Sequence, residues 1–360
     1  MEKTMRSYRT IIQLAALGTT FALAALTQAG AAETPPSTIR LAGPGNASGA
    51  PYGSGVLGII RAKKLLEEEF KNEAVKIDWQ FPRGTGPAIN EAFANGQLDF
   101  SNYGGLPNIV GRGAGLRTKV LASNGSSPIY IVARNGAKID SVADIKGKKI
   151  SVSRGTIYEW SINRVLAKFG LSERDVQIFD LQSADQISAF SSSDIDAIVA
   201  GNNLLDLVDR GLGKTIYTTK GTLGAGTNFG SLVVSENFVR KYPETTQRVV
   251  NVYIKAAYYS AQEENRNELY DIWTLTGVPR VAFVKDFDGD PLRERLNPLL
   301  DDFYVGNVIS GIKFAVGSKL IRAPFKPEDW IDRSYQDKAI KELGYTGFWR
   351  AHDEDGKPKS

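Results

Sequence analysis

Short apolar runs alternate with segments of helical periodicity from Ile39 onward, and this rhythm constrains the fold more than any other feature of the sequence. The run IRLAG is followed by a glycine-rich loop and then by a helical pattern in which Val56, Ile59, Leu66 and Phe70 share one face. The runs VKIDWQF, LDFSNYG and KVLASNG continue the alternation. Strands that alternate with helices predict an α/β protein with mostly parallel sheets covered by helices.

A second set of runs, from SPIYIVAR to TIYTTK, repeats the alternation. Within it Ile162, Val165, Leu166 and Phe169 form a helical stripe, and Gly170 is placed to end that helix. Because 360 residues exceed what one hydrophobic core usually serves, we expect two lobes, each with its own sheet.

The chain is then expected to return to the first lobe through SLVVS and a helix that begins at Pro243. The buried face of that helix is predicted to carry Val249, Val252, Tyr253, Ala256 and Ala257. The predicted divisions are lobe 1 at 38–127 and 227–345, lobe 2 at 128–226, and a polar tail at 346–360, of which the segment AHDEDGKPKS is expected to be disordered.

The first 31 residues have the three-part plan of a cleavable secretory signal. Lys3, Arg6 and Arg9 precede an apolar stretch from Ile11 to Leu26, and small residues follow up to a cleavage point after Ala31. The apolar stretch is shorter than the roughly 20 residues needed to span a bilayer. We therefore expect removal by the general secretion pathway, with a retained membrane helix as the alternative.

Cysteine is absent from the sequence, which excludes disulfides and a lipid-modified cysteine anchor. An exported chain of this kind is expected to be free in a Gram-negative periplasm. The formal net charge of +4 falls to about +2 without the signal, and no long Lys/Arg run predicts nucleic-acid binding.

Glycine-bearing loops follow several predicted strands and precede helices. In open parallel sheets, ligands bind at this edge, where free N–H groups of a helix N-terminus favour an anion. These loops predict a site for an oxyanion, although a glycine before a helix is often only a turn. The loops are Gly45 to Gly49, Arg83 to Gly86, Gly104 to Pro107, Arg154 to Tyr158 and Gly201 to Asn203.

Two motif-like segments are interpreted as structural. The glycines of GPGNASG have the spacing G-x-G-x-x-x-G, which differs from a dinucleotide fingerprint. Asp286, Asp288 and Asp290 imitate a calcium loop, but Pro291 stands where glycine is required. We expect that segment to be a solvated turn.

The residue counts favour a binding protein over an enzyme. With no cysteine and one histidine, His352, a Cys/His metal site is excluded, and a serine or threonine nucleophile would lack its usual base. Carboxylate-pair hydrolysis stays open. No cofactor is predicted.

The segments FPRGTGPAINEAFANGQLDFSNYGGLPNIVGRGAG and IDSVADIKGKKISVSRGTIYEWSINRVLAKFGLSERDVQIFDL resemble the substrate-binding proteins of ABC importers for aliphatic sulfonates, taurine and nitrate. SADQISAFSSSDIDAIVAG and NFVRKYPETTQRVVNVYIKAA continue the resemblance in the same order. It implies a type II periplasmic binding protein fold, two lobes joined by a hinge near Pro128 and Gly226, with the solute held between them.

The resemblance also implies ligand-binding residues and partners. The partners would be a small anionic solute, with an aliphatic sulfonate or taurine favoured, and an ABC permease complex of the inner membrane, the receptor itself being a monomer. The predicted ligand-binding residues are Gly45, Asn46, Ala47, Arg83, Gly84, Thr85, Tyr103, Gly104, Gly105, Leu106, Arg154, Gly155, Thr156, Ile157, Tyr158, Asn202 and Asn228.

Within this set, Gly105, Gly155 and Thr156 are hypothesised to donate hydrogen bonds to the oxyanion, with Arg154 or Arg83 nearby. The rings of Tyr103, Tyr158 and Trp160 would wall an organic group, unless they belong to the core. Three alternatives remain: an enzyme similar to thiamine-pyrimidine synthases, a ligand-sensing protein, and a receptor of a tripartite transporter.

Overall fold

The computed structural model describes residues 33–44, 51–82, 84–222 and 227–359. Its contacts divide the chain into a short unit, Met1–Pro35, and a larger unit, Pro36–Ser360, which holds the fold described below. The predicted signal segment lies outside the described residues, as do Gly45, Asn46, Ala47 and Arg83. Among the described residues, no helix combines the length and the apolar character needed to cross a membrane.

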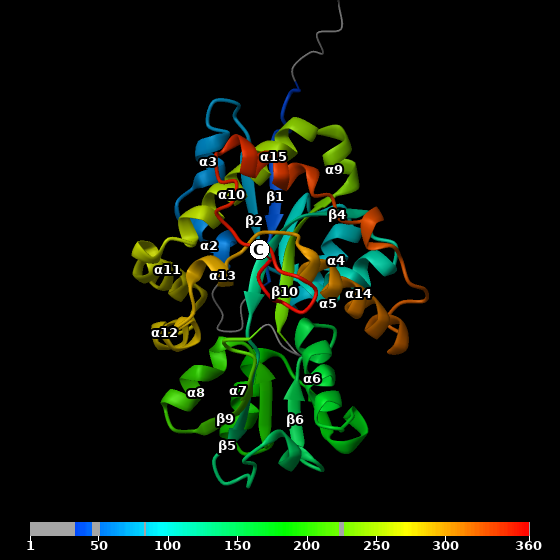
Figure 1. Cartoon of the computed structure of the whole chain (residues 1–360), viewed down its shortest axis with the longest axis vertical. Helices are drawn as coiled ribbons and strands as arrows, with labels where there is room; N and C mark the ends of the chain where they lie inside the picture. The colour runs from blue at the N-terminus through cyan, green and yellow to red at the C-terminus, as the bar shows by residue number, and fades with distance from the viewer. Residues whose placement is uncertain (1–32, 45–50, 83, 223–226, 360) are drawn as a thin grey trace, which may run out of the picture. The chain divides into compact units, whose positions relative to one another are not determined.

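The first sheet, sheet A, has the strand order β2-β1-β3-β10-β4 (Figure 1). Strand β1 pairs in parallel with β2 and β3, and β10 runs antiparallel to β3 and β4. The central strands β3 and β10 are buried over almost their whole length, whereas the edge strand β2 is only partly buried. Its strands are β1 (Thr38–Ala42), β2 (Lys76–Gln80), β3 (Phe100–Gly104), β4 (Thr118–Ser127) and β10 (Asn228–Ser235).

The second sheet, sheet B, has the order β7-β6-β8-β5-β9 and the same pattern of directions. Strand β6 is parallel to β7 and β8, and β5 is antiparallel to β8 and β9. Its strands are β5 (Tyr130–Arg134), β6 (Lys149–Val152), β7 (Gln177–Asp180), β8 (Ala197–Ala200) and β9 (Gly213–Thr218). The predicted α/β class with two mostly parallel sheets is confirmed.

The helices of the first half of the chain follow short loops and pack beside the two sheets. Helices α4 and α5 contact each other beside sheet A, and α6 covers sheet B (Figure 1). The described helices of this half are α2 (Gly55–Ala62), α3 (Leu65–Glu69), α4 (Thr85–Ala94), α5 (Gly105–Gly113), α6 (Ile157–Lys168), α7 (Ser183–Ser191) and α8 (Leu205–Asp209). Short 3₁₀ turns are η1 (Val142–Ile145), η2 (Glu173–Asp175) and η3 (Asn202–Leu204).

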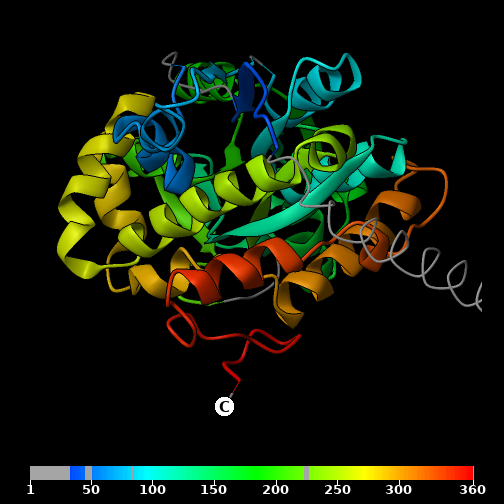
Figure 2. The ribbon, with the colours of Figure 1, turned by 90° about the horizontal axis from the view of Figure 1, so that it is seen from above.

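The second half of the chain is mostly helical after β10. Helix α10 packs against α2 and α15, and Figure 2 shows α10 in yellow-green beside α15 in red. The helices are α9 (Glu236–Lys241), α10 (Pro243–Ser260), α11 (Arg266–Trp273), α12 (Arg280–Phe287), α13 (Leu292–Arg295), α14 (Asp302–Gly317) and α15 (Ser334–Glu342), with 3₁₀ turns η4 (Glu263–Asn265), η5 (Thr274–Thr276) and η6 (Pro327–Asp329).

Four clusters of buried side chains form the core. One lies between sheet A and α10 and includes the whole predicted face of that helix, a prediction that is confirmed. Another fills the space between sheet B and α6, where Ile162, Val165 and Leu166 are buried as predicted, whereas Phe169 is 43% exposed. A third joins β5, β8, η3 and α8 of the sheet B region to α11, α12 and α13. The C-terminal helices therefore pack on elements of both sheets.

The chain passes from sheet A to sheet B between Ser127 and Tyr130 and returns between Thr218 and Asn228. The exact lobe boundaries stay predictions. The predicted disorder of the tail is wrong for its described part. Trp349 is buried, and the backbone N–H of His352 donates to Asp301 Oδ2 at 2.8 Å. A buried aromatic ring and a buried acceptor thus hold a segment whose composition is polar.

Candidate functional site

A cleft of about 370 Å³ lies at the carboxyl ends of β3, β6 and β8 and is lined from both sheet regions. The helices α4, α5 and α6 begin beside it. This is the edge at which ligands bind in open parallel sheets. A larger hollow of about 830 Å³ lies around Thr38, Arg40 and Asp99, and contains none of the predicted site residues. The smaller cleft is therefore the candidate site.

The cleft brings together a little less than half of the predicted ligand-binding residues. Those that line it are Thr85, Tyr103, Gly104, Thr156, Ile157, Tyr158, Asn202 and Asn228. The cleft lining does not include Gly84, Gly105, Leu106, Arg154 or Gly155. Leu106 is fully buried in the core, and a Cβ on Gly105 would meet the Phe229 ring at 2.4 Å. Ligand contact by any of these residues stays a prediction.

Three buried side-chain atoms that line the cleft have no hydrogen-bond partner among the described residues. They are Thr85 Oγ1, Ser153 Oγ and Asn203 Nδ2, and we call these three residues the donor set. Thr85 begins α4 beside sheet A, whereas Ser153 follows β6 and Asn203 lies in η3, both beside sheet B. Leaving a buried polar group unpaired costs about 1–3 kcal/mol. Such groups, converging from two sheets, are what a ligand would satisfy.

The loop before α4 holds Thr85 in an unusual conformation. Gly84 has φ +94° and Thr85 has φ +57°, a left-handed conformation that β-branched residues rarely adopt. Gly86 allows α4 to approach α5, because a Cβ there would lie 2.3 Å from Pro107 Cγ. Backbone strain of this kind gathers at functional sites. The sequence RGTG was singled out for its glycines, while the informative residue is the threonine between them.

The loop before α6 uses its predicted donors internally. The Gly155 N–H donates to Glu159 Oε2 at 2.8 Å, and the Thr156 hydroxyl donates to Ser153 O at 2.6 Å. Thr156 also caps α6 by accepting from the Tyr158 N–H at 3.2 Å. In this conformation both donors are already used within the loop, so a hydrogen bond from Gly155 or Thr156 to an oxyanion stays a prediction.

The Arg154 guanidinium faces carboxylates instead of the cleft. It bonds to Glu159 Oε1 at 2.5 Å and to Glu173 Oε2 at 2.9 Å, and its side chain is partly exposed. The hydrogen bond to Glu173 is the main reason that its pKa lies above the ordinary arginine value. Arg154 was predicted from its position in a loop, which does not show where a long side chain finds its partner.

The predicted aromatic wall is only partly correct. The ring of Trp160 is 1% exposed and packs edge-on against Phe229, so it belongs to the core. Tyr103 and Tyr158 do line the cleft. Burial raises the pKa of Tyr158 to about 12, so its hydroxyl keeps its proton at neutral pH. Five further rings that sequence reasoning missed also line the cleft: Tyr52, Phe229, Trp273, Phe283 and Phe287.

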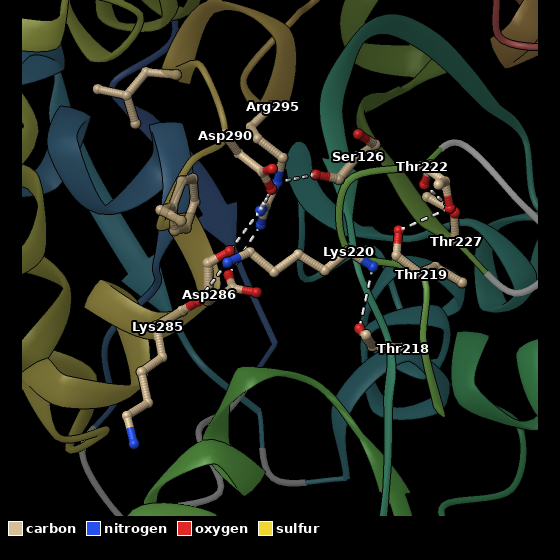
Figure 3. Close-up of polar contacts among 12 residues, drawn as sticks. Ser126, Thr218, Thr219, Lys220, Thr222, Thr227, Lys285, Asp286, Asp290 and Arg295 are labelled. Carbon is tan, nitrogen blue, oxygen red and sulfur yellow. Dashed lines mark hydrogen bonds and ion pairs between the residues drawn. The ribbon is translucent and has the colours of Figure 1, made fainter. Parts of the chain in front are cut away.

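The segment predicted as a solvated turn is instead a buried ion-pair cluster. Asp286 is 3% exposed, and its carboxylate accepts from Tyr130 Oη at 2.7 Å and from Arg295 Nη2 at 2.9 Å. Arg295 Nη1 also donates to Asp290 Oδ2 at 2.7 Å. In Figure 3 both carboxylates point toward the Arg295 side chain. Of the three aspartates, Asp288 alone is exposed as predicted.

Lys220 completes this group, which we call the charge cluster: Lys220, Asp286, Asp290 and Arg295. Lys220 Nζ donates to the carbonyl of Lys285 at 2.7 Å, and Figure 3 shows its side chain extending toward Asp286. Burial raises the pKa of Asp286, while the Arg295 charge is the largest of several effects that lower it. A sequence signal existed, because Asp286 shares the buried face of α12 with Ala282 and Phe283.

No group of three or more His, Asp or Glu residues in the described chain is arranged to hold a metal ion. His352 does not line the cleft. Its ring lies between Asp301 and Glu294, with Nδ1 at 3.1 Å from Asp301 Oδ2 and Nε2 at 3.4 Å from Glu294 Oε2.

Known proteins are similar to this chain over most of its length. A Bacillus subtilis protein whose name assigns it provisionally to aliphatic sulfonates is 28% identical, over 80% of this chain and 86% of that protein. A Brucella abortus protein, provisionally named a binding protein, is 30% identical over 79% of this chain and 88% of its own length.

Solved structures extend the comparison. The structure of a protein from Methylobacillus flagellatus, provisionally assigned as the periplasmic sulfonate-binding protein SsuA of an ABC transporter, has a TM-score of 0.78 and 27% identity over 89% of this chain and 99% of that one. The MOPS-bound alkanesulfonate-binding protein SsuA from Xanthomonas axonopodis has a TM-score of 0.69 at 22% identity, covering 84% of this chain and 100% of that one. The desulfurization enzyme DszB, at 15% identity and a TM-score of 0.63 over 86% of this chain and 100% of that one, shares the fold.

The family model described as NMT1/THI5 like matches residues 67–266. The predicted resemblance is confirmed, and the fold is that of the two-lobed periplasmic binding proteins. The chain belongs to the NMT1/THI5-like family.

Proposed function

We propose that this protein is a periplasmic solute receptor that binds a small organic anion, with a sulfonate favoured, and delivers it to an ABC importer. The observation that carries the proposal is the donor set. Thr85 Oγ1, Ser153 Oγ and Asn203 Nδ2 lack partners and line one cleft from both sheet regions. Hydroxyl and amide donors in a cleft sheltered from water bind an anion well, because few water molecules compete for them.

Two further features support an anionic head group with an organic body. The N-termini of α4, α5 and α6 meet at the cleft, and each carries partial positive charge. The rings of Trp273, Phe283 and Phe287 line the cleft as well, and they offer an apolar surface. Relatives named for sulfonate binding make a sulfonate the first choice.

The same reasoning makes a receptor the better proposal than an enzyme. The polar part of the cleft lining is made of hydroxyl and amide groups with Asp286 and Arg295, while the one histidine lies with Asp301 and Glu294. A periplasmic location, a permease partner and a monomeric state belong to this proposal and rest on the relatives and on the expected signal.

Isothermal titration calorimetry of the protein without residues 1–31 tests the proposal. Ethanesulfonate, taurine, MOPS, nitrate and sulfate would be titrated separately. We expect saturable binding of at least one sulfonate, weakened when Thr85 and Ser153 are changed to Val and Ala. Binding of none of the three sulfonates, ethanesulfonate, taurine and MOPS, by the folded protein would contradict the proposal.

A further inference from the structure

Arg295 is the sole Lys or Arg side chain that lines the cleft within the described part of the chain. It is 7% exposed, and its guanidinium lies 4.1 Å from the centre of the Phe287 ring. A buried guanidinium of this kind would be the obvious partner for an anionic ligand, because the low dielectric of a protein interior strengthens charge–charge attraction.

The contacts of Arg295 are, however, made within the protein. Nη1 donates to the Asp286 carbonyl at 3.0 Å as well as to Asp290, Nη2 donates to Asp286 Oδ2, and Nε donates to Ser126 O at 3.3 Å. Figure 3 shows the guanidinium between the two carboxylates and Ser126. An anion that approaches it would therefore have to displace a carboxylate that is already in place.

The charges of the cluster cancel. Lys220 and Arg295 contribute two positive charges, and Asp286 and Asp290 contribute two negative charges. Of these four residues, Asp286 and Arg295 line the cleft, and their charges are paired with each other. The donor set, in contrast, is neutral and unpartnered.

We propose that Asp286 and Asp290 are specificity-determining residues: they act as built-in counter-ions of Arg295, so that the cleft selects organic oxyanions and rejects small inorganic anions. This proposal rests on the proposed function and deepens it. A free buried cation would bind chloride, nitrate or sulfate through charge alone, since such attraction has little directional preference. With Arg295 neutralised, a ligand gains affinity only by fitting the hydroxyl and amide donors and by covering the rings of Trp273, Phe283 and Phe287.

The charge cluster also connects the two sheet regions, and this suggests a competing role. Tyr130 of β5 donates to Asp286 of α12, and Lys220, which follows β9, donates to the Lys285 carbonyl. If the aspartates mattered only as a latch between these regions, loss of the Tyr130 hydroxyl would change anion selectivity as much as loss of a carboxylate charge.

The test compares Asp286→Asn, Asp290→Asn and the double variant with the natural protein. The control is Asp288→Asn, which removes the same charge from an exposed position of the same segment. Calorimetric titrations with chloride, nitrate and sulfate measure the inorganic anions, and titrations with ethanesulfonate and MOPS measure the organic ones. Near-UV circular dichroism checks that each variant retains its tertiary structure.

We expect the affinity for nitrate and sulfate to rise by at least about tenfold in Asp286→Asn and further in the double variant, a factor that charge exposure in a sheltered cleft readily supplies. Asp288→Asn should leave every affinity unchanged. Tyr130→Phe, which alters no charge, should leave the ratio of inorganic to organic affinities unchanged.

Folded Asp286→Asn and double variants with the selectivity of the natural protein would overturn the proposal, and so would a Tyr130→Phe variant that reproduces the effect of Asp286→Asn. If the double variant does not fold, Asp290→Asn decides the matter alone, because Asp290 is the less buried partner. If the natural protein binds no organic anion, the proposed function fails, while the gain or absence of inorganic binding in the variants still decides this inference.

Discussion

The donor set lines the same cleft as Asp286 and Arg295 of the charge cluster, and the two groups differ in whether their polar atoms have partners among the described residues. Thr85, Ser153 and Asn203 each bring a buried polar atom without one, whereas Asp286 and Arg295 bond to each other and to further groups. The paired groups are held in place by their own hydrogen bonds and carry no desolvation cost of an unpaired polar atom. The unpaired groups carry a desolvation cost that a ligand relieves. The contrast therefore indicates where binding energy is available.

The largest expected effect concerns the charge cluster. Arg295→Met leaves Asp286 and Asp290 buried without their counter-ion, and we expect the free energy of unfolding to fall by about 3–5 kcal/mol. Urea unfolding measures this loss. Arg293→Met serves as the control, because Arg293 is an exposed arginine on the same short helix. Equal losses of unfolding free energy in the two variants would show that the charge cluster contributes no more to stability than an exposed arginine does.

A smaller effect is expected at Gly155, next to the donor set. Gly155→Ala forces alanine to φ +69°, which costs about 1–2 kcal/mol. Gly170→Ala is a matched control, because Gly170 has the same φ of +69° and nothing within 4 Å of an added Cβ. At Gly155 that Cβ would lie 3.1 Å from Pro87 Cγ. Thermal unfolding should show a larger loss for Gly155→Ala, and only this variant should bind ligand more weakly.

The donor set itself should respond in affinity and not in stability. Ser153→Ala removes one hydrogen bond to the charged head group of the ligand, about 1.5 kcal/mol at the low end for a charged acceptor, while the free energy of unfolding stays equal or rises slightly. Ser151→Ala is the control, since Ser151 Oγ is also buried and unpartnered but does not line the cleft. Calorimetry with ethanesulfonate should separate the two variants. A loss of affinity in both would mean that Ser153 acts through packing.

The smallest effect on stability concerns Tyr158 and is expected only above pH 10. The folded-state pKa of Tyr158 is about 12, compared with 10.0 for the ordinary side chain. Above pH 10 the unfolded chain therefore loses the tyrosine proton first, so this contribution to stability is present below pH 10 and is lost as the pH rises toward 12. Relative to its own stability at neutral pH, Tyr158→Phe should show a shallower decline of stability above pH 10. An unchanged decline would contradict the assigned pKa.

Much of the fold was predictable, because it rests on local patterns. The alternation of strands and helices predicted both sheets, and the periodicity after Pro243 predicted the buried face of α10 correctly. These features depend on near neighbours in the sequence. The tail was mispredicted because its order comes from Asp301, which is 51 residues from His352.

The candidate site was less predictable, because much of its arrangement depends on contacts between residues that are far apart in the sequence. Glycine-rich loops indicated the correct edge of the sheets, and Thr85, Thr156 and Tyr158 do line the cleft. The loop pattern could not show that Arg154 pairs with Glu159 and Glu173, or that Asp286 is buried by Tyr130 from 156 residues away. The helical periodicity around Ala282 and Phe283 did place Asp286 on the buried face of a helix. A polar residue on an apolar face was nevertheless interpreted as part of a turn.

The strand order has a consequence for how the molecule is made. Strand β10 separates β3 from β4 in sheet A, yet it is synthesised after every strand of sheet B. Sheet B occupies one continuous stretch of chain and can form as soon as that stretch is available. Sheet A cannot be completed until β10 is available to pair with both β3 and β4, so the cleft, which is lined from both sheets, requires most of the chain.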